Sequence, residues 1–342
     1  MSRRSSRRHF IIGSAAGIAA ASLPAGAQTS AAPATGSRAR VLGTEHRAIK
    51  RAGSEAINLY LWRKRTAAAP TRGVIVFSHG SSMAGTPVFD LQVPGKPQYS
   101  TMDWFARLGY DTWCLDFEGY GRSDKQRPIN FDIANGADDL AAACDYIAKV
   151  TGESKHLHYG LSSGGLRAAV YAQRHPERVR RLALDAFVWT GKGSPTLEAR
   201  RKRIGEWRSS NRRPIDNAMV QSIFTRDHPG TADADVVDAF AKAILALDTT
   251  VPTGTYLDMT VNLPVVQPEK LDVPTLIMRG QFDGIASLPD LVEFFDRLPN
   301  PDKQFTVMPG IAHSSLHEKN VALVYHILHS FFSQPAPVYT GG

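Results

Sequence analysis

Ser162 stands at the centre of the pentapeptide 160–164, Gly-Leu-Ser-Ser-Gly, which has the pattern G-x-S-x-G. The apolar run 156–161 before it predicts a short strand, and the run 163–175 after it has apolar residues at helical spacing. A serine on a tight strand-to-helix turn exposes its hydroxyl, and such a turn tolerates only small neighbours. The pattern predicts a nucleophilic serine. The pentapeptide alone leaves open a helix N-cap serine flanked by glycines.

Two further reactive side chains follow predicted strands. Asp283 comes after the run 275–278, and His313 comes after the run 304–308. Parallel strands gather such groups at the carboxyl edge of their sheet. A serine hydroxyl needs a base to take its proton, and a carboxylate on the far ring nitrogen fixes the imidazole. We expect His313 to be that base and Asp283 the carboxylate, with Asp185, at the end of an earlier predicted strand, as the alternative acid.

The elements that position these residues alternate along the chain. Strand-like and helical runs follow one another over residues 70–187 and again from residue 272 onward, which predicts a mostly parallel sheet covered by helices on both faces. Residues 188–270 are polar and helix-rich without a convincing buried strand, so we interpret them as an inserted cap over the carboxyl edge of the sheet. Strands are predicted over 55–62, 73–77, 111–116 and 179–187, and helices over 102–108, 136–150, 288–298 and 319–332.

Four separate pieces of the chain together resemble the α/β-hydrolase superfamily, in particular its capped serine hydrolases of the esterase and lipase type. The first is His79-Gly80 after a predicted strand, and the second is the segment 116–124 after the next strand. The turn at Ser162 and the two strand ends with Asp283 and His313 complete the set, in the chain order typical of this superfamily. The resemblance implies an α/β fold with an eight-stranded, mostly parallel sheet and an inserted helical cap.

The resemblance also implies a function, the hydrolysis of a carboxylic ester of a small molecule through an acyl-enzyme intermediate, with no metal and no organic cofactor. By resemblance, the backbone N–H groups of Ser81 and Ser163 form the oxyanion hole, and His79 braces its loop. A serine at position 162 separates the chain from the dehalogenases and epoxide hydrolases of this fold, which use aspartate there. Hydrolysis of an amide, a lactone or the C–C bond of a β-diketone would use the same residues. A non-catalytic binding protein is the alternative from another class.

Two segments bear on the substrate. The loop 82–100 either lines the acyl pocket through Val88, Phe89 and Leu91 or lies on the surface. The cap segment 192–213 holds eight basic and two acidic residues. It is either a solvated face balanced by ion pairs within the cap or a cationic rim that attracts an anionic substrate. Four cap aromatics are expected in the core rather than in a substrate wall: Trp189, Trp207, Phe224 and Tyr256.

The N-terminus predicts export. Residues 6–12 (Ser-Arg-Arg-His-Phe-Ile-Ile) resemble a twin-arginine signal, and a weakly apolar stretch, 11–23, precedes the small residues Ala-Gly-Ala at 25–27. We therefore expect the twin-arginine export machinery as a partner and a periplasmic or secreted location. The predicted organisation is a signal peptide over 1–27, a linker over 28–43, a hydrolase core over 44–187 and 271–335, and the cap over 188–270.

Charge and cysteine content narrow the remaining classes. The 342 residues have a net charge of +8, and beyond residue 27 the chain holds 36 basic and 32 acidic side chains, a net charge of +4. This excess is too small to indicate a nucleic-acid partner, and no nucleic-acid-binding motif is present. Because twin-arginine substrates are exported already folded, Cys114 and Cys144 are expected as buried free thiols. No stretch after residue 30 is long and apolar enough to span a bilayer.

Overall fold

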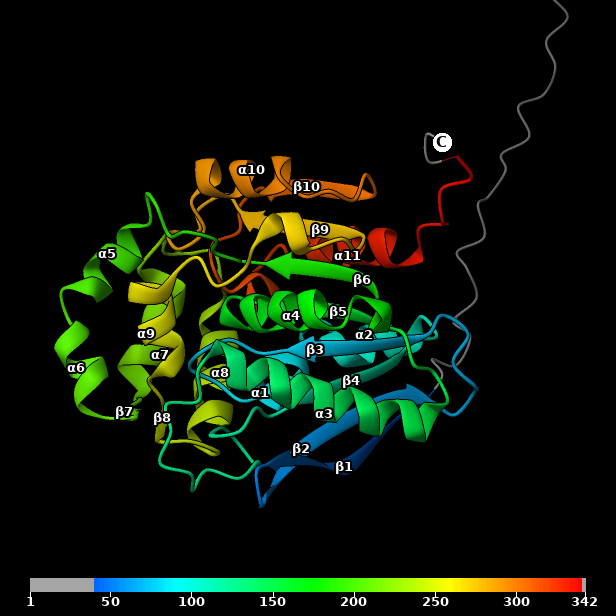
Figure 1. Cartoon of the computed structure of the whole chain (residues 1–342), viewed down its shortest axis with the longest axis horizontal. Coiled ribbons are helices and arrows are strands. Elements are labelled where there is room, and N and C mark those ends of the chain that lie inside the picture. Colours follow the sequence, from blue (N-terminus) through cyan, green and yellow to red (C-terminus); the bar gives the residue numbers. More distant parts are fainter. Residues whose placement is uncertain (1–39, 340–342) are drawn as a thin grey trace, which may run out of the picture. The chain divides into compact units, whose positions relative to one another are not determined.

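Eight strands form one sheet within residues 40–339, the part of the chain that the computed structural model describes (Figure 1). Their spatial order is β1-β2-β4-β3-β5-β6-β9-β10, with β2 antiparallel to both of its neighbours and all other pairs parallel. This arrangement confirms the predicted α/β class. The strands are β1 (Val41–Ala52), β2 (Glu55–Thr66), β3 (Val74–Ser78), β4 (Asp111–Leu115), β5 (His156–Leu161), β6 (Val179–Asp185), β9 (Thr275–Gly280) and β10 (Lys303–Met308).

Helices cover both faces of the sheet. In Figure 1, α3 and α4 lie in front of the strands, and α2 and α11 lie behind them. Trp104 of α2 packs on Tyr325 of α11 with ring centroids 4.9 Å apart, which joins the two rear helices. None of the helices within residues 40–339 is long and apolar enough to cross a membrane. The core helices are α1 (Gly85–Phe89), α2 (Thr101–Arg107), α3 (Ile133–Thr151), α4 (Ser163–Arg174), α10 (Leu288–Asp296) and α11 (Val321–Ser333).

The segment 188–270, here called the cap, lies between β6 and β9 in the chain. Its elements gather at the left of Figure 1, the side toward which the arrowheads of β6 and β9 point. The cap therefore stands over the carboxyl edge of the sheet. It also contains one short antiparallel pair of strands, which the sequence did not indicate. Its elements are α5 (Pro195–Arg201), α6 (Ile204–Ser209), β7 (Arg212–Pro214), α7 (Asn217–Thr225), α8 (Ala234–Leu245), β8 (Thr250–Pro252) and α9 (Gly254–Leu257).

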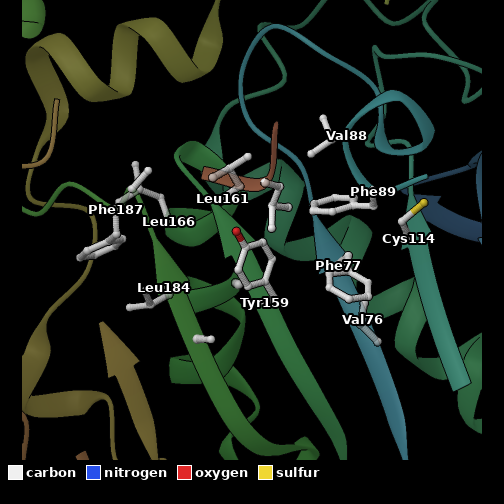
Figure 2. Packing of buried hydrophobic residues seen from close by; sticks show 14 of the residues in the cluster. Val76, Phe77, Val88, Phe89, Cys114, Tyr159, Leu161, Leu166, Leu184 and Phe187 are labelled. Atoms are coloured by element: carbon white, nitrogen blue, oxygen red, sulfur yellow. The ribbon is translucent and has the colours of Figure 1, made fainter. Parts of the chain in front are cut away.

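The centre of the core lies where β3 and β5 meet the loop after β3. Figure 2 shows Phe77, Phe89 and Tyr159 side by side, and the ring centroid of Phe77 lies 5.0 Å from that of Phe89 and 5.8 Å from that of Tyr159. Burying one such side chain stabilises a fold by about 2 kcal/mol. This packing fixes the two strands that lead into the Ser162 turn and the Ser81 loop. Cys114 and Cys144 are buried free thiols, as predicted.

Strand β1 was not predicted, and a buried ion-pair cluster attaches it to the core. Lys50 of β1 is 5% exposed, and its Nζ lies 2.6 Å from Glu118 Oε2 and 2.5 Å from Asp139 Oδ1. Arg127 shares the Glu118 carboxylate at 2.6 Å. A buried cation needs such partners because it has lost its water. The alternation of charged residues in β1 conceals that one of them points inward.

The predicted N-terminal segments fall largely outside the structure. The expected signal peptide, 1–27, and the first part of the expected linker, 28–43, lie outside the described residues. Strand β1 begins at Val41, so the sheet starts earlier than the core boundary at residue 44 that the sequence indicated.

Candidate active site

Ser162 lies on the turn between β5 and α4, where its backbone is left-handed. Its φ is 56° and its ψ is −124°, a conformation that costs a residue with a side chain about 1–3 kcal/mol. Ser162 occupies the N-cap position of α4, yet its side chain makes no capping hydrogen bond. The alternative interpretation as a capping serine is therefore wrong. The hydroxyl is instead directed at His313.

The glycines of the pentapeptide allow the strand and helix to approach closely. A Cβ atom on Gly164 would lie 2.1 Å from the carbonyl oxygen of Ser78, and one on Gly160 would lie 2.5 Å from the Cα atom of Gly165. Neither distance leaves room for a carbon atom, and in both cases the obstacle is backbone. Glycine at these two positions is therefore required by the contact of α4 with β3 and β5.

Three side chains from separate strand ends meet at this turn. His313 Nε2 lies 3.2 Å from Ser162 Oγ, and His313 Nδ1 lies 3.0 Å from Asp283 Oδ1. Asp283 also accepts hydrogen bonds from the N–H groups of Ile285 and Ala286 at 2.8 and 3.2 Å. Burial raises the pKa of Asp283, but His313 and these hydrogen bonds outweigh it and hold that pKa below its usual value. An ionised Asp283 accepts from Nδ1–H, which leaves Nε2 to accept from the serine hydroxyl.

Asp185, the alternative acid, has other partners. Its carboxylate accepts hydrogen bonds from the hydroxyls of Tyr159 and Ser315. No hydrogen bond within the described range joins it to His313. Burial raises the pKa of Asp185 to about 6, although those two hydroxyls oppose the shift. The structure therefore brings Asp283, and not Asp185, onto the imidazole.

Glu318, which no sequence motif indicates, holds the loop that carries His313. Its buried carboxyl group accepts hydrogen bonds from the N–H groups of Ala312 at 2.6 Å and Ser314 at 3.1 Å. Burial raises the pKa of Glu318 to about 7 against the opposing effect of these two donors. Because the bonds flank His313 on both sides, Glu318 positions the imidazole without touching it. Its one sequence signal is an acidic residue shortly before a helix, which is also typical of a surface position.

The loop after β3 places Ser81 beside the serine turn. Ser81 Oγ donates a hydrogen bond to Ser163 Oγ at 2.7 Å, and the Ser81 carbonyl accepts from Tyr120 at 3.1 Å and from Arg213 at 3.2 Å. These bonds fix the peptide groups on both sides of the cavity at Ser162. In the described part of the chain, the N–H groups of Ser81 and Ser163 donate to no protein acceptor. Two unpartnered donors beside the nucleophile are what an oxyanion hole requires.

His79 braces this loop, as predicted. Its Nε2 accepts the N–H of Phe117 at 3.1 Å, and its Nδ1–H donates to the Gly80 carbonyl at 2.8 Å. Burial, followed by the nearby Arg167 guanidinium, holds the pKa of His79 well below its usual value. The ring is therefore neutral, and both of its nitrogens are used inside the protein.

Comparison with known protein families decides the classification. Residues 95–320 match the family described as serine aminopeptidase, S33 (Hydrolase_4). The chain belongs to this family. The resemblance to the α/β-hydrolase superfamily is thereby confirmed, and the protein is a hydrolase of the esterase and lipase type.

Individual relatives of this S33-family hydrolase carry ester-cleaving names. The chain is similar to a pimeloyl-[acyl-carrier protein] methyl ester esterase from Neisseria meningitidis serogroup B (strain MC58), with 30% identity over 230 residues, 63% of this chain and 81% of that protein. It is also similar to a monoacylglycerol lipase from Mycolicibacterium smegmatis, with 23% identity over 258 residues, 74% of this chain and 85% of that protein.

Solved structures share the fold of this S33-family hydrolase. A thermophilic esterase from Thermogutta terrifontis superimposes with a TM-score of 0.60 at 20% identity, covering 85% of this chain and all of that one. A monoacylglycerol lipase from Paleococcus ferrophilus superimposes with a TM-score of 0.57 at 17% identity, covering 80% of this chain and 98% of that one. At these identities the likeness establishes the fold alone.

Two cavities adjoin between the core and the cap of this S33-family hydrolase. An inner cavity of about 30 Å³ has Ser162 and His313 in its wall, and an outer cavity of about 790 Å³ lies along the cap. The side chains of Arg200, Arg226 and Tyr256 line both cavities and therefore stand at their junction. The inner cavity is far smaller than the outer one. A group that reacts at Ser162 thus enters a narrow space.

The apolar residues considered for the acyl pocket lie elsewhere. Val88, Phe89 and Leu91 are buried in the core, where Phe89 packs on β3, so both expectations for these side chains, pocket wall and surface, are wrong. Of the same loop, Ser82 and Met83 line the inner cavity instead. The reason is that the loop forms helix α1, whose apolar face turns toward the sheet.

The basic segment 192–213 divides into outward and inward side chains. Arg203 forms an exposed ion pair with Glu206 at 2.6 Å, as expected of a solvated face. Arg200 and Arg213 turn inward instead, and their guanidinium carbons lie 4.1 and 3.9 Å from the ring centroid of Tyr256. Arg203 thus belongs to a solvated face, whereas Arg200 and Arg213 face the cavities.

Tyr256 ionises unusually easily in this setting. Burial by itself raises the pKa of Tyr256, but Arg200, Arg213 and a contact with Ser82 bring it down to about 7. The phenolate is favoured because two guanidinium groups face one ring. Tyr256, expected only as a core residue, is therefore also part of a cavity wall.

Two groups of side chains in the described residues bring three metal-ligating atoms within 4.8 Å of one another. One consists of Asp227, Asp283 and His313, in which Asp283 and His313 are already bonded to each other. The other consists of Cys144, His156 and His158, all of them buried. This second group lies apart from Ser162.

The setting of Tyr256 has a spectroscopic consequence. We expect the phenolate absorption of the folded protein to rise with a midpoint near pH 7, which is the pKa of about 7 that the two guanidinium groups impose. Ultraviolet difference spectroscopy over a pH titration measures this band. The Tyr256→Phe variant should lose the transition, and Arg200→Gln should move it to higher pH, while Arg208→Gln, at an exposed position that lines neither cavity, should leave it in place. A wild-type protein without absorption change below the range of ordinary tyrosines would contradict this assignment.

Proposed function

We propose that this chain hydrolyses carboxylic esters through an acyl-enzyme intermediate on Ser162. One observation carries the proposal: Ser162 Oγ, His313 and Asp283 form a continuous chain with separations of 3.2 and 3.0 Å. The names of the Neisseria and Mycolicibacterium relatives, a methyl ester esterase and a monoacylglycerol lipase, support an ester as the substrate.

Acylation begins with a proton transfer. His313 Nε2 takes the hydroxyl proton while Ser162 Oγ attacks the ester carbonyl carbon, and the Asp283 carboxylate stabilises the imidazolium that results. The bond from the carbonyl carbon to the alcohol oxygen then breaks, and His313 returns the proton to that oxygen. The alcohol leaves, and the acyl group remains on Ser162.

Deacylation repeats these steps with water. His313 takes a proton from a water molecule that attacks the acyl carbon, and then returns it to Ser162 as the acid is released. In both halves a negative charge develops on the carbonyl oxygen. The N–H groups of Ser81 and Ser163 are the donors that we assign to it, each worth about 3 kcal/mol in the transition state.

Loss of the nucleophile tests the proposed function. We expect p-nitrophenyl acetate and butyrate to be hydrolysed faster than the decanoate, because the inner cavity is small. Ser162→Ala should lower kcat by at least about 10⁴-fold. The assay uses residues 28–342, with circular dichroism to verify folding and p-nitroanilides in parallel. Turnover of the anilides alone would change the proposed substrate from an ester to an amide. Equal rates for the wild type and Ser162→Ala would overturn the assignment of Ser162 as the nucleophile.

Isosteric replacement separates the two acids. Asp283→Asn removes the acceptor for Nδ1–H and should lower kcat by about 10³ to 10⁴-fold, because the imidazole loses its orientation and its counter-charge. Asp185→Asn keeps an oxygen for Tyr159 and Ser315 and should change kcat by less than about tenfold. Steady-state kinetics on one ester measures both. The reverse ranking would make Asp185 the catalytic acid.

We also propose that the protein acts outside the cytoplasm, in the periplasm or the medium, after export by the twin-arginine route. The support is the order of features in residues 6–12, 11–23 and 25–27, namely an arginine pair, a weakly apolar stretch and small residues. Replacing Arg7 and Arg8 together with lysine should retain the precursor in the cytoplasm, as measured by fractionation and immunoblotting. Unchanged export of this doubly substituted precursor would contradict the route, and the precursor with Arg3→Lys and Arg4→Lys is the matched control.

A further inference from the structure

The junction of the two cavities concentrates positive charge that the carboxylates of the protein balance only in part. Within residues 40–339, no carboxylate forms an ion pair with Arg200 or Arg213. Arg213 is only 6% exposed, and its Nε atom has no hydrogen-bond partner. Arg226 has a carboxylate nearby, because its Nε lies 3.4 Å from Asp227 Oδ1. A desolvated cation without a counter-charge is costly, so a fold retains it only where something offsets the cost.

Other buried cations of this chain are compensated within the protein. Lys50 is surrounded by two carboxylates, and Arg181 lies 2.8 Å from Asp302. Arg167 has no carboxylate partner among the described residues, but its guanidinium lies 4.1 Å from the Phe117 ring centroid, and it lines neither cavity. The guanidinium groups at the junction differ from these other buried cations because they gather around one open space next to the nucleophile.

The position of the junction relates this charge to the reaction. Arg200, Arg226 and Tyr256 belong to the wall of the inner cavity, as do Ser162 and His313. The same three side chains also face the outer cavity. If the charged group of a substrate is held at the junction, the ester of the same molecule can therefore reach Ser162 Oγ. Guanidinium groups bind planar or tetrahedral oxyanions through paired N–H donors.

We propose that this junction binds an oxyanion of the substrate, so that the ester cleaved at Ser162 carries a carboxylate or phosphate group. The inference rests on the proposed ester hydrolysis and adds the substrate class to it. Arg200 and Arg226 donate to the oxyanion from the cap. Arg213, also a cap residue, lies on the Tyr256 ring and donates to Ser82 Oγ of the core at 2.6 Å, so it adds charge where the cap meets the core.

Tyr256 offers an internal substitute for that anion. In the absence of substrate, its phenolate partly balances the guanidinium groups around it. A bound oxyanion takes over this balance and disfavours the phenolate, so binding is accompanied by proton uptake at Tyr256. The guanidinium groups that surround Tyr256 are Arg200, Arg213 and Arg226, and Ser82 is its hydrogen-bond partner.

Matched esters test the proposal. Monomethyl adipate carries a carboxylate where methyl heptanoate, of the same length, carries an ethyl group. We expect kcat/KM of the wild type to be higher for the anionic ester, and the ratio of the two values to fall about tenfold or more in Arg200→Gln and Arg226→Gln, since each loses a charge-assisted hydrogen bond. Arg200→Lys should restore part of the ratio. Arg208→Gln, which removes an exposed arginine of the same segment that lines neither cavity, should leave the ratio within about twofold.

A second pair identifies the oxyanion. A higher kcat/KM for 2-phosphoethyl butyrate than for 3-butyryloxypropanoate assigns the junction to phosphate, and the reverse assigns it to carboxylate. Equal ratios in wild type, Arg200→Gln and Arg226→Gln would overturn the anion site while leaving ester hydrolysis intact.

Binding is measured separately from turnover. Ser162→Ala should bind monomethyl adipate in a calorimetric titration, and the added Arg200→Gln substitution should weaken that binding about tenfold or more. If no ester is turned over but this binding is observed, the proposed function fails and the anion site stands. If esters are hydrolysed but Ser162→Ala shows no Arg200-dependent binding, the anion site fails alone.

Discussion

The left-handed turn at Ser162 is the constraint on which the rest of the site depends. Its φ of 56° is unfavourable for serine, and the strain of about 1–3 kcal/mol must be offset by the surrounding packing. The Ser162 N–H donates to the Asp185 carbonyl at 2.8 Å, so the end of β6 holds the start of the turn. Gly164 holds its other side, since α4 passes within contact of the Ser78 carbonyl. The direction of the hydroxyl is thus a consequence of sheet and helix packing, and the side chains that meet it come from the ends of β9 and β10.

The same edge of the sheet holds three buried carboxyl groups with different environments. Asp283 accepts from an imidazole and two N–H groups, and its pKa lies below the usual value. Asp185 accepts hydrogen bonds from two hydroxyls, and Glu318 accepts them from two N–H groups. Burial raises the pKa of the Asp185 carboxyl to about 6 and that of the Glu318 carboxyl to about 7. The bonded imidazole together with two N–H groups keeps the Asp283 carboxylate ionised, whereas two hydrogen bonds each do not overcome the desolvation of Asp185 and Glu318. The residue that can stabilise an imidazolium is therefore the one beside His313.

The sequence predicts the parts of this structure that depend on local pattern. Buried strands such as 156–161 and the G-x-S-x-G turn follow from hydrophobic runs and glycine spacing. The roles expected of Ser162, Asp283 and His313 follow from their chain order, which matches that of the superfamily. Contacts between distant segments carry no such pattern. Glu318 resembles a surface acid, and the inward turn of Arg200 cannot be distinguished from the outward turn of Arg203 in the same basic run. Strand β1 was missed because its charged residues conceal that Lys50 faces Glu118 and Asp139.

A division of roles between core and cap follows from where the charges lie. In the proposed reaction, the core supplies the nucleophile, the base and the oxyanion donors on rigid strand ends, and these groups would act on any acyl carbonyl. The cap supplies Arg200 and Arg226, which differ from one another because Asp227 lies beside Arg226 and no carboxylate of the described residues pairs with Arg200. Counting Arg213, two guanidinium charges remain unmatched, and a Tyr256 phenolate neutralises at most one of them. A substrate oxyanion pairs with these guanidinium groups directly and takes the place of the phenolate, which is why the charge balance at the junction favours an anionic substrate.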